Sequence, residues 1–293
     1  MKGTEKVEIK HVILPFDFSS SAKNALKHAI SIAKNCRTDI TILCVMDLCS
    51  IQSLKYRVSK FADFEEQAYE MFNEYVKQTF TVKESSVIKE CLVSENNWTK
   101  AVHDLANHKA GALIVLGTGS KGQDDYFSSS HAHKIVDSLH TPVLVIKEEH
   151  QLYEYRTITT PLDETFHTRE KLLYVTIMAN AFDAKVSLVG LQIHSDRDSA
   201  YHMQAIMRQA SQYIQVKVRH YQDKLIASKN EIIDLVKYAD EEKTDLLVIM
   251  GSHEKSLSHL FSRAYAQQVA DKANAPVLIC PKRISMVMSA VSI

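Results

Sequence analysis

Glycine and serine residues gather after residue 116, where they could bind an anion. Residues 113–116 form an unbroken apolar run, which is typical of a strand buried on both faces of a parallel sheet. Gly117, Gly119 and Gly122 follow at once, where a chain that leaves a strand must turn and expose backbone N–H groups. Residues 128–130 are serines that can cap a following helix. This order predicts a βαβ unit with an anion-binding turn at the carboxyl edge of the sheet.

A carboxylate follows another predicted strand near the start of the chain. Asp17 comes directly after the mainly apolar residues 12–16, and the serines at 19–21 can cap the next helix. Two interpretations of Asp17 remain open. It either contacts a ligand at the sheet edge or caps the helix that follows.

The same plan occurs twice along the chain. Gly117 is matched by Gly251 at a spacing of 134 residues, and Asp17 is matched by Asp163 at a spacing of 146. We therefore predict two tandem domains, at residues 1–149 and 150–293. Each has the order β-α-β-α-β-α-β-α-β, which winds into a five-stranded parallel sheet with helices on both faces. The predicted fold class is α/β, doubly wound.

The apolar periodicity places the individual elements. The predicted strands are residues 12–17, 40–46, 87–93, 113–116 and 143–146 in the first copy, and 157–162, 186–191, 214–220, 245–251 and 275–280 in the second. The predicted helices are residues 22–33, 61–76, 98–107 and 132–139, followed by 171–182, 200–210, 232–239 and 263–273.

Composition limits the partners and the compartment. Lys+Arg and Asp+Glu both number 35, so a formal net charge of zero favours neither nucleic acid nor an anionic membrane as a partner. No apolar run approaches the roughly 18 residues that cross a bilayer, and the polar first residues do not resemble a signal peptide, so we expect a cytoplasmic protein. The five cysteines have no C-x-x-C spacing, which argues against a disulfide framework or a zinc site, and we predict no metal ligands.

The chain resembles the universal stress protein family over nearly its whole length, as two tandem copies. The residues that carry the resemblance are the Asp that ends the first strand, the glycine loop after the fourth, the serine at the next helix and the P-V-L-V-I strand at 142–146. The resemblance implies Rossmann-like domains of the adenine-nucleotide hydrolase type, packed as a pseudo-dimer through residues 143–146 and 277–280. It also implies ATP or AMP, with Mg²⁺, as the ligand, and a protein partner or a homodimer.

The resemblance also assigns roles to residues of the first copy. Asp17 would hold the adenosine end, Val45 would pack near the adenine and Gly117 would begin the phosphate loop. The family's phosphate contacts would fall at Ser120, Ser129 and Ser130. Gly119, Lys121 and Gly122 could compensate for departures from the pattern, because glycine permits close backbone approach and lysine supplies a positive charge. This sequence departs from the family pattern at Ser120, which stands where the second glycine is expected.

The second copy departs further from the pattern. Its counterparts are Asp163, Gly251 and His253, but Glu254 takes the place of a loop glycine. A carboxylate in a phosphate loop repels an anionic ligand. We therefore expect a degenerate second site, in which Asp163 serves as a helix cap.

These expectations point to a non-catalytic stress-response protein that binds ATP or AMP in its first domain and acts through partners. One alternative is a ligand-free interaction scaffold with two degenerate sites. Another is a weak ATPase or an adenylate-forming enzyme, which would need an S-G-G-x-D-S loop after the first strand. Residues 15–21, P-F-D-F-S-S-S, lack its glycines. The chain also has no G-x-S-x-G elbow and no P-loop, so we predict no catalytic residue.

Overall fold

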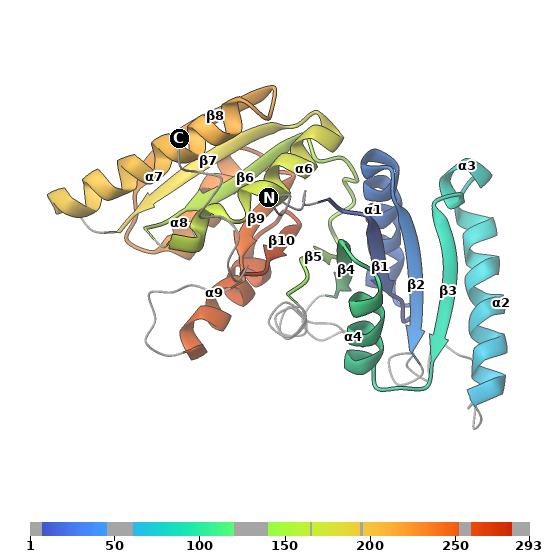
Figure 1. Cartoon of the computed structure of the whole chain (residues 1–293). Helices are drawn as coiled ribbons and strands as arrows, with labels where there is room; N and C mark the ends of the chain where they lie inside the picture. The colour runs from blue at the N-terminus through green and yellow to red at the C-terminus, as the bar shows by residue number, and fades with distance from the viewer. Residues whose placement is uncertain are drawn as a thin grey trace, which may run out of the picture. The chain divides into compact units, whose positions relative to one another are not determined.

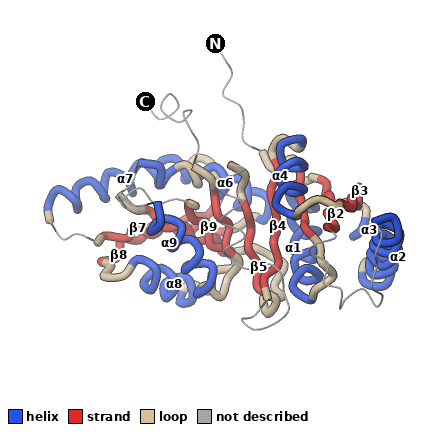
Figure 2. Tube along the Cα trace, turned by 90° about the horizontal axis from the view of Figure 1, so that it is seen from below, coloured by secondary structure: helices blue, strands red, loops and turns tan. Residues whose placement is uncertain are grey.

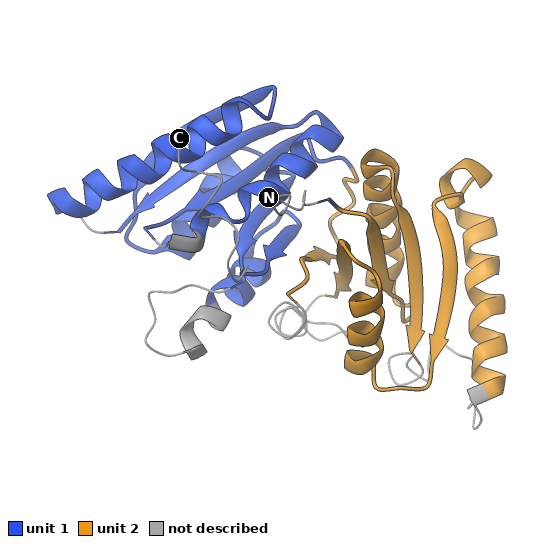
Figure 3. Cartoon of the chain, in the orientation of Figure 1, with its two compact units in different colours: residues 1–8, 154–293 blue, residues 9–153 orange. Residues whose placement is uncertain are grey.

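The chain divides into two compact units. The computed structural model describes residues 8–45, 61–119, 140–164, 166–193, 196–251 and 259–282. The N-terminal unit is Ile9–Tyr153, and the C-terminal unit consists mainly of Glu154–Ile293 (Figure 3).

Five parallel strands form the sheet of the N-terminal unit, in the order β3-β2-β1-β4-β5. Its elements are β1 (His11–Pro15), α1 (Ser20–Cys36), β2 (Asp39–Val45), α2 (Phe61–Thr79), α3 (Val82–Ser85), β3 (Ile88–Ser94), α4 (Trp98–His108), β4 (Ala112–Thr118) and β5 (Val143–Lys147). The strand β1 is central, and α2 runs alongside the edge strand β3 (Figure 1).

The C-terminal unit has the same topology, with the strand order β8-β7-β6-β9-β10. Its elements are β6 (Thr157–Leu162), the 3-10 helix η1 (Phe166–Arg169), α6 (Leu172–Phe182), β7 (Lys185–Gln192), α7 (Arg197–Gln215), β8 (His220–Ala227), α8 (Glu231–Glu241), β9 (Leu246–Met250), α9 (His259–Lys272) and β10 (Val277–Cys280). The predicted five-stranded, parallel, doubly wound fold is thus confirmed in both units.

Helices on both faces explain why the central strands read as apolar runs. In the C-terminal unit, α6 and α7 lie on one side of the sheet, and α8 and α9 lie on the other (Figure 2). Every residue of β4 and β9 is consequently buried. No helix in the described part of the chain is both long and apolar enough to cross a membrane.

One predicted strand is wrong. Residues 214–220 were expected to form a strand, but Ile214 lies in α7 and the strand β8 begins only at His220. Ile214 completes the buried stripe of α7, which also contains Met203, Ile206, Met207 and Ala210 at helical spacing. The edge strand β8 is mostly half-buried or exposed, so it lacks the apolar run of a central strand.

A polar stripe on α1 holds the segment after β5. Asn24 donates to the carbonyl oxygens of Lys147 (3.1 Å) and His150 (2.7 Å), and Ser31 donates to that of Tyr153 (2.6 Å). His28, which is fully buried, lies within 3.1 Å of the His150 carbonyl through Nε2. These bonds explain why the N-terminal unit extends to Tyr153, although residues 147–155 look like a polar linker in the sequence.

Titration of His28 should weaken the N-terminal unit in acid. Burial lowers the pKa of His28 from 6.5 to about 4. As pH falls from 6.5 towards 4, the unfolded chain takes up a proton that the folded chain does not, so stability falls. We expect wild type to lose about 2 kcal/mol relative to His28→Gln between pH 6.5 and 4.5. Urea unfolding followed by fluorescence of the single tryptophan, Trp98 in α4, measures this, and parallel pH profiles for the two proteins would contradict it.

Candidate functional site

The carboxyl ends of β1 and β4 form the topological switch point of the N-terminal unit. The chain leaves β1 towards β2 on one side, whereas β4 and β5 lie on the other. In open α/β sheets, ligands bind in the crevice outside such strand ends. Asp17 follows β1 by two residues, so the structure places this carboxylate at the switch point.

Asp17 is buried and orients the helix cap. Its side chain is 5% exposed, and its Oδ1 accepts hydrogen bonds from the backbone N–H of Ser19 (3.0 Å) and from the Ser19 hydroxyl (2.5 Å). The Ser19 hydroxyl in turn accepts from the N–H of Ala22 (3.1 Å) and is the N-cap of α1. Asp17 is therefore not the cap itself. It fixes the capping hydroxyl and lies near the positive end of the helix dipole.

The backbone between these two residues adopts a rare conformation. Phe18 has a φ of 67°, in the left-handed region that aromatic residues seldom occupy. Such a residue costs about 1–3 kcal/mol and persists only where its surroundings enforce it. The Phe18 ring is buried and packs edge-on against Phe16, with ring centroids 5.0 Å apart. This packing holds the turn that presents Asp17.

Gly117 has a structural role that the sequence did not reveal. It was expected to begin the loop after the fourth strand, but β4 continues through Thr118, and Gly117 pairs with Ile146 inside the sheet. A Cβ atom at Gly117 would lie 2.2 Å from the backbone oxygen of Ser21. The missing side chain therefore lets the first turn of α1 pack directly on β4, which brings the Asp17 turn and the end of β4 together.

The structure describes only some of the residues predicted for the nucleotide site. Val45 is the fully buried last residue of β2, so it ends at the same sheet edge as Asp17. Gly119 follows β4 and is half-buried. The remaining predicted phosphate contacts lie outside the described residues: Ser120, Lys121, Gly122, Ser129 and Ser130.

A lysine side chain is buried at the matching sheet edge of the C-terminal unit. Asp163 follows β6 and is 8% exposed, and its backbone N–H donates to the Thr168 hydroxyl (3.1 Å). Lys171 is 1% exposed, and its ammonium donates to the carbonyl oxygen (2.6 Å) and the hydroxyl (3.1 Å) of Thr168. The backbone of Asp163 and the ammonium of Lys171 thus meet at one threonine hydroxyl.

The charge of Lys171 is coupled to that of Asp163. Burial lowers the pKa of Lys171 to about 8, while the nearby Asp163 carboxylate acts to raise it. The buried phenol of Tyr265 in α9 also senses this carboxylate, and burial together with the charges of Glu231 and Asp163 raises its pKa well above 10. The second switch point therefore holds a cation supplied by the protein itself.

The structure describes Asp163 and Gly251 of the predicted second site. Asp163 does not cap α6, because the N-cap position is Lys171 and no side chain caps this helix. The cap interpretation was wrong because η1 separates Asp163 from α6. Gly251 is buried, and its N–H donates to the Cys280 carbonyl (2.8 Å), while His253 lies outside the described residues.

Sequence reasoning overlooked Lys171, although a signal was present. Lys171, Val175, Met178 and Phe182 follow one another at helical spacing, and the last three form a buried apolar stripe. A lysine in line with such a stripe is a candidate for burial. In contrast, Ser19 was already among the predicted caps.

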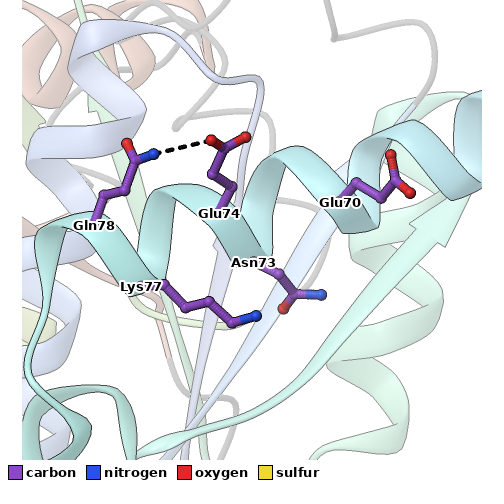
Figure 4. A pocket seen from close by; sticks show the side chains of 5 residues that line it. All are labelled: Glu70, Asn73, Glu74, Lys77 and Gln78. Carbon is purple, nitrogen blue, oxygen red and sulfur yellow. Dashed lines mark hydrogen bonds between the residues drawn. The ribbon is translucent and has the colours of Figure 1, made fainter.

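None of the described residues that line a groove along α2 is a predicted site residue. Its described lining comes from one helix and consists of Glu70, Asn73, Glu74, Lys77 and Gln78 (Figure 4). The Gln78 amide donates to Glu74 (2.9 Å), an ordinary pair at i, i+4 spacing. We assign no site to this groove. In the described residues, no group of three or more His, Cys, Asp or Glu side chains could hold a metal ion.

Comparisons with known proteins agree with this architecture. Residues 8–147 match the model of the universal stress protein family. A universal stress protein of Methanocaldococcus jannaschii is 26% identical over 153 residues, which cover 47% of this chain and 82% of that protein.

Two solved structures share the fold over both units. The crystal structure of a universal stress protein from Archaeoglobus fulgidus is 14% identical, with a TM-score of 0.68, and the match covers 94% of this chain and 97% of that protein. A functionally unknown protein from Pseudomonas aeruginosa PAO1 is also 14% identical, with a TM-score of 0.56 and coverage of 94% and 93%. Residues 8–147 therefore form a domain of the universal stress protein family.

Proposed function

We propose that the N-terminal unit binds an adenine nucleotide, ATP or AMP, at the carboxyl edge of β1, β2 and β4. The chain would then act as a non-catalytic stress-response protein through a protein partner or a second copy. The buried carboxylate of Asp17 at the topological switch point carries this proposal. In this proposal, the C-terminal unit is a second domain of the same family and binds no ligand.

The adenosine end of the ligand fits this chemistry. A carboxylate can accept up to about four hydrogen bonds, which suits a nucleoside with neighbouring hydroxyl and amino donors. Val45 offers a fully buried apolar strand end on the same edge, suited to a base. The phosphates would extend towards residues 119–130 and would carry Mg²⁺ with them.

The buried Lys171 supports the proposal that the N-terminal unit binds a ligand and the C-terminal unit does not. In the C-terminal unit, the counterpart of Asp17 faces the charge of a fully buried lysine. The N-terminal unit has Ala25 at the matching position, 146 residues earlier, and Ala25 is fully buried. An internal cation that compensates Asp163 removes the need for a ligand to do so.

Calorimetric titration of the full chain tests the proposal. We expect ATP or AMP, with Mg²⁺, to bind wild type, and Asp17→Asn to weaken binding roughly ten- to hundred-fold, because a hydrogen bond to a charged group is lost. The amide of this variant keeps an oxygen acceptor for Ser19, so the helix cap should survive. The matched variant, Asp163→Asn, should leave the affinity unchanged.

Other outcomes would select the alternatives. No heat at millimolar nucleotide would overturn the nucleotide proposal and leave a ligand-free interaction scaffold. Steady release of inorganic phosphate from ATP, lost in Asp17→Asn, would show a weak ATPase instead. Equal loss of binding in Asp17→Asn and Asp163→Asn would contradict the asymmetry.

A further inference from the structure

Two cysteines on neighbouring strands bring their sulfur atoms close together. The Sγ atoms of Cys44 in β2 and Cys91 in β3 lie 4.0 Å apart. Cys91 pairs directly with Ile42, so Cys44 is its diagonal neighbour on the same face of the sheet. Both cysteines are reduced in the structure. No sequence spacing indicated this pair, because 47 residues separate the two.

We propose that Cys44 and Cys91 are a peroxide-oxidisable dithiol, which forms a reversible disulfide between β2 and β3. This inference does not depend on nucleotide binding. It assigns a chemical modification to a pair of residues outside the candidate nucleotide site.

The two thiols differ in access, which sets the order of events. Cys91 is half-buried on the edge strand, whereas Cys44 is fully buried. A peroxide therefore reaches Cys91 first. Helix α2 contacts β3. Burial raises the pKa of Tyr69 in this helix, and the nearby sulfur atoms of Cys91 and Cys44 add to the effect, so Tyr69 lies beside the pair.

The chemistry balances with one peroxide molecule. The Cys91 thiolate attacks one peroxide oxygen, the O–O bond breaks, and the leaving alkoxide or hydroxide takes a proton. The sulfenic acid formed at Cys91 is then attacked by the sulfur of Cys44, which forms the S–S bond and releases water. The two sulfurs lose two electrons in total, and the peroxide gains them.

Disulfide formation requires the strands to move. The sulfur atoms must approach from 4.0 Å to about 2.05 Å. Because β3 is an edge strand, β2 is its one hydrogen-bonded neighbour among the described strands. The β2–β3 pairing already contains a register shift between Ile40 and Thr41. A shift of β3 would therefore disturb the sheet hydrogen bonds of the β2–β3 pair and of no other described strand pair in this unit.

The remaining cysteines provide internal controls. Burial raises the pKa of Cys36 in α1 to about 11, which suppresses its reactive thiolate. Cys280 is buried in β10 of the C-terminal unit. Cys49 lies outside the described residues, and it is the natural competitor because it shares the tryptic peptide 38–55 with Cys44.

Peptide mapping of the full chain tests the pairing. The protein is treated with hydrogen peroxide, alkylated in denaturant and digested with trypsin. We expect peptide 38–55 to be linked to peptide 90–100, and dithiothreitol to release it. The Cys49→Ser variant, in which both proposed partners remain, should give the same link. Cys44→Ser should abolish it and leave Cys91 to be oxidised further.

The following results would overturn the proposal. If Cys49→Ser loses the link, the partner of Cys91 is Cys49. If Cys91 remains alkylatable after peroxide treatment, or is oxidised without any link in Cys49→Ser, the pair is not an oxidisable dithiol. Protein oxidised in urea serves as a reference for random pairing, and a yield of the 44–91 link no higher than in urea would show that the fold does not direct it.

Discussion

The Gly117→Ala substitution should destabilise the N-terminal unit by about 3 kcal/mol or more, at the upper end of the range for overpacked cores. The new Cβ would lie 2.2 Å from the oxygen and 2.4 Å from the carbonyl carbon of Ser21. Both atoms belong to the backbone, so the first turn of α1 must move away from β4. Because that turn carries the Ser19 cap held by Asp17, nucleotide affinity should fall together with stability.

Gly190→Ala is the matched control, because Gly190 is also buried within a strand. Its added Cβ would meet the side-chain ends of Leu225 (2.7 Å) and Met207 (2.9 Å), which can rotate away. We expect a change within about 1 kcal/mol, since a Gly-to-Ala change also restricts the unfolded chain. Urea unfolding followed by Trp98 fluorescence reports Gly117→Ala, and circular dichroism reports Gly190→Ala. Equal unfolding midpoints for Gly117→Ala and wild type would refute the backbone-contact argument.

Lys171 should make the stability of the C-terminal unit rise with pH in the alkaline range. Its pKa is about 8 in the folded protein and 10.5 when unperturbed. Between these values the unfolded chain holds a proton that the folded chain has lost, so raising the pH favours folding. Relative to Lys171→Met, wild type should gain about 2 kcal/mol between pH 7.5 and pH 9.5.

The difference between the two proteins isolates Lys171 from other alkaline groups. Tyr265 is buried with a raised pKa and opposes the trend near pH 10, but it is present in both proteins. Lys185 on β7 is exposed, so Lys185→Met serves as a control for the loss of one positive charge from the same unit. Urea unfolding followed by circular dichroism supplies the profiles. A Lys171→Met profile parallel to that of wild type would show that this lysine does not titrate on unfolding.

Local patterns were sufficient to find most elements of the fold. The strands β1, β2 and β4 are covered on both faces, so their sequences are apolar runs that periodicity recognises. Helix α1 was equally clear, with a serine cap before a buried apolar stripe. The misplaced strand β8 shows the limit, because an edge strand buries too little surface to leave a pattern.

The candidate site was only partly predictable. Asp17 could be placed at the switch point, because the carboxyl ends of parallel strands share one edge. Its bonds to Ser19 could not, since they depend on the left-handed turn at Phe18. Gly117 was predicted to begin the loop, but β4 continues through Thr118, and the close approach of the Ser21 backbone could not be read from the sequence. A loop glycine and a glycine that admits a neighbouring backbone look alike in a sequence.

The sequence by itself determined the repeated α/β plan, the strand ends and the carboxylates that follow them, because these follow from local periodicity and chain order. Only the tertiary structure decided which distant groups meet: Gly117 with the backbone of Ser21, Cys44 with Cys91, and Lys171 with the surroundings of Asp163. Such contacts depend on strand order and register. Those in turn are set by the packing of the whole core, and no short stretch of sequence encodes them.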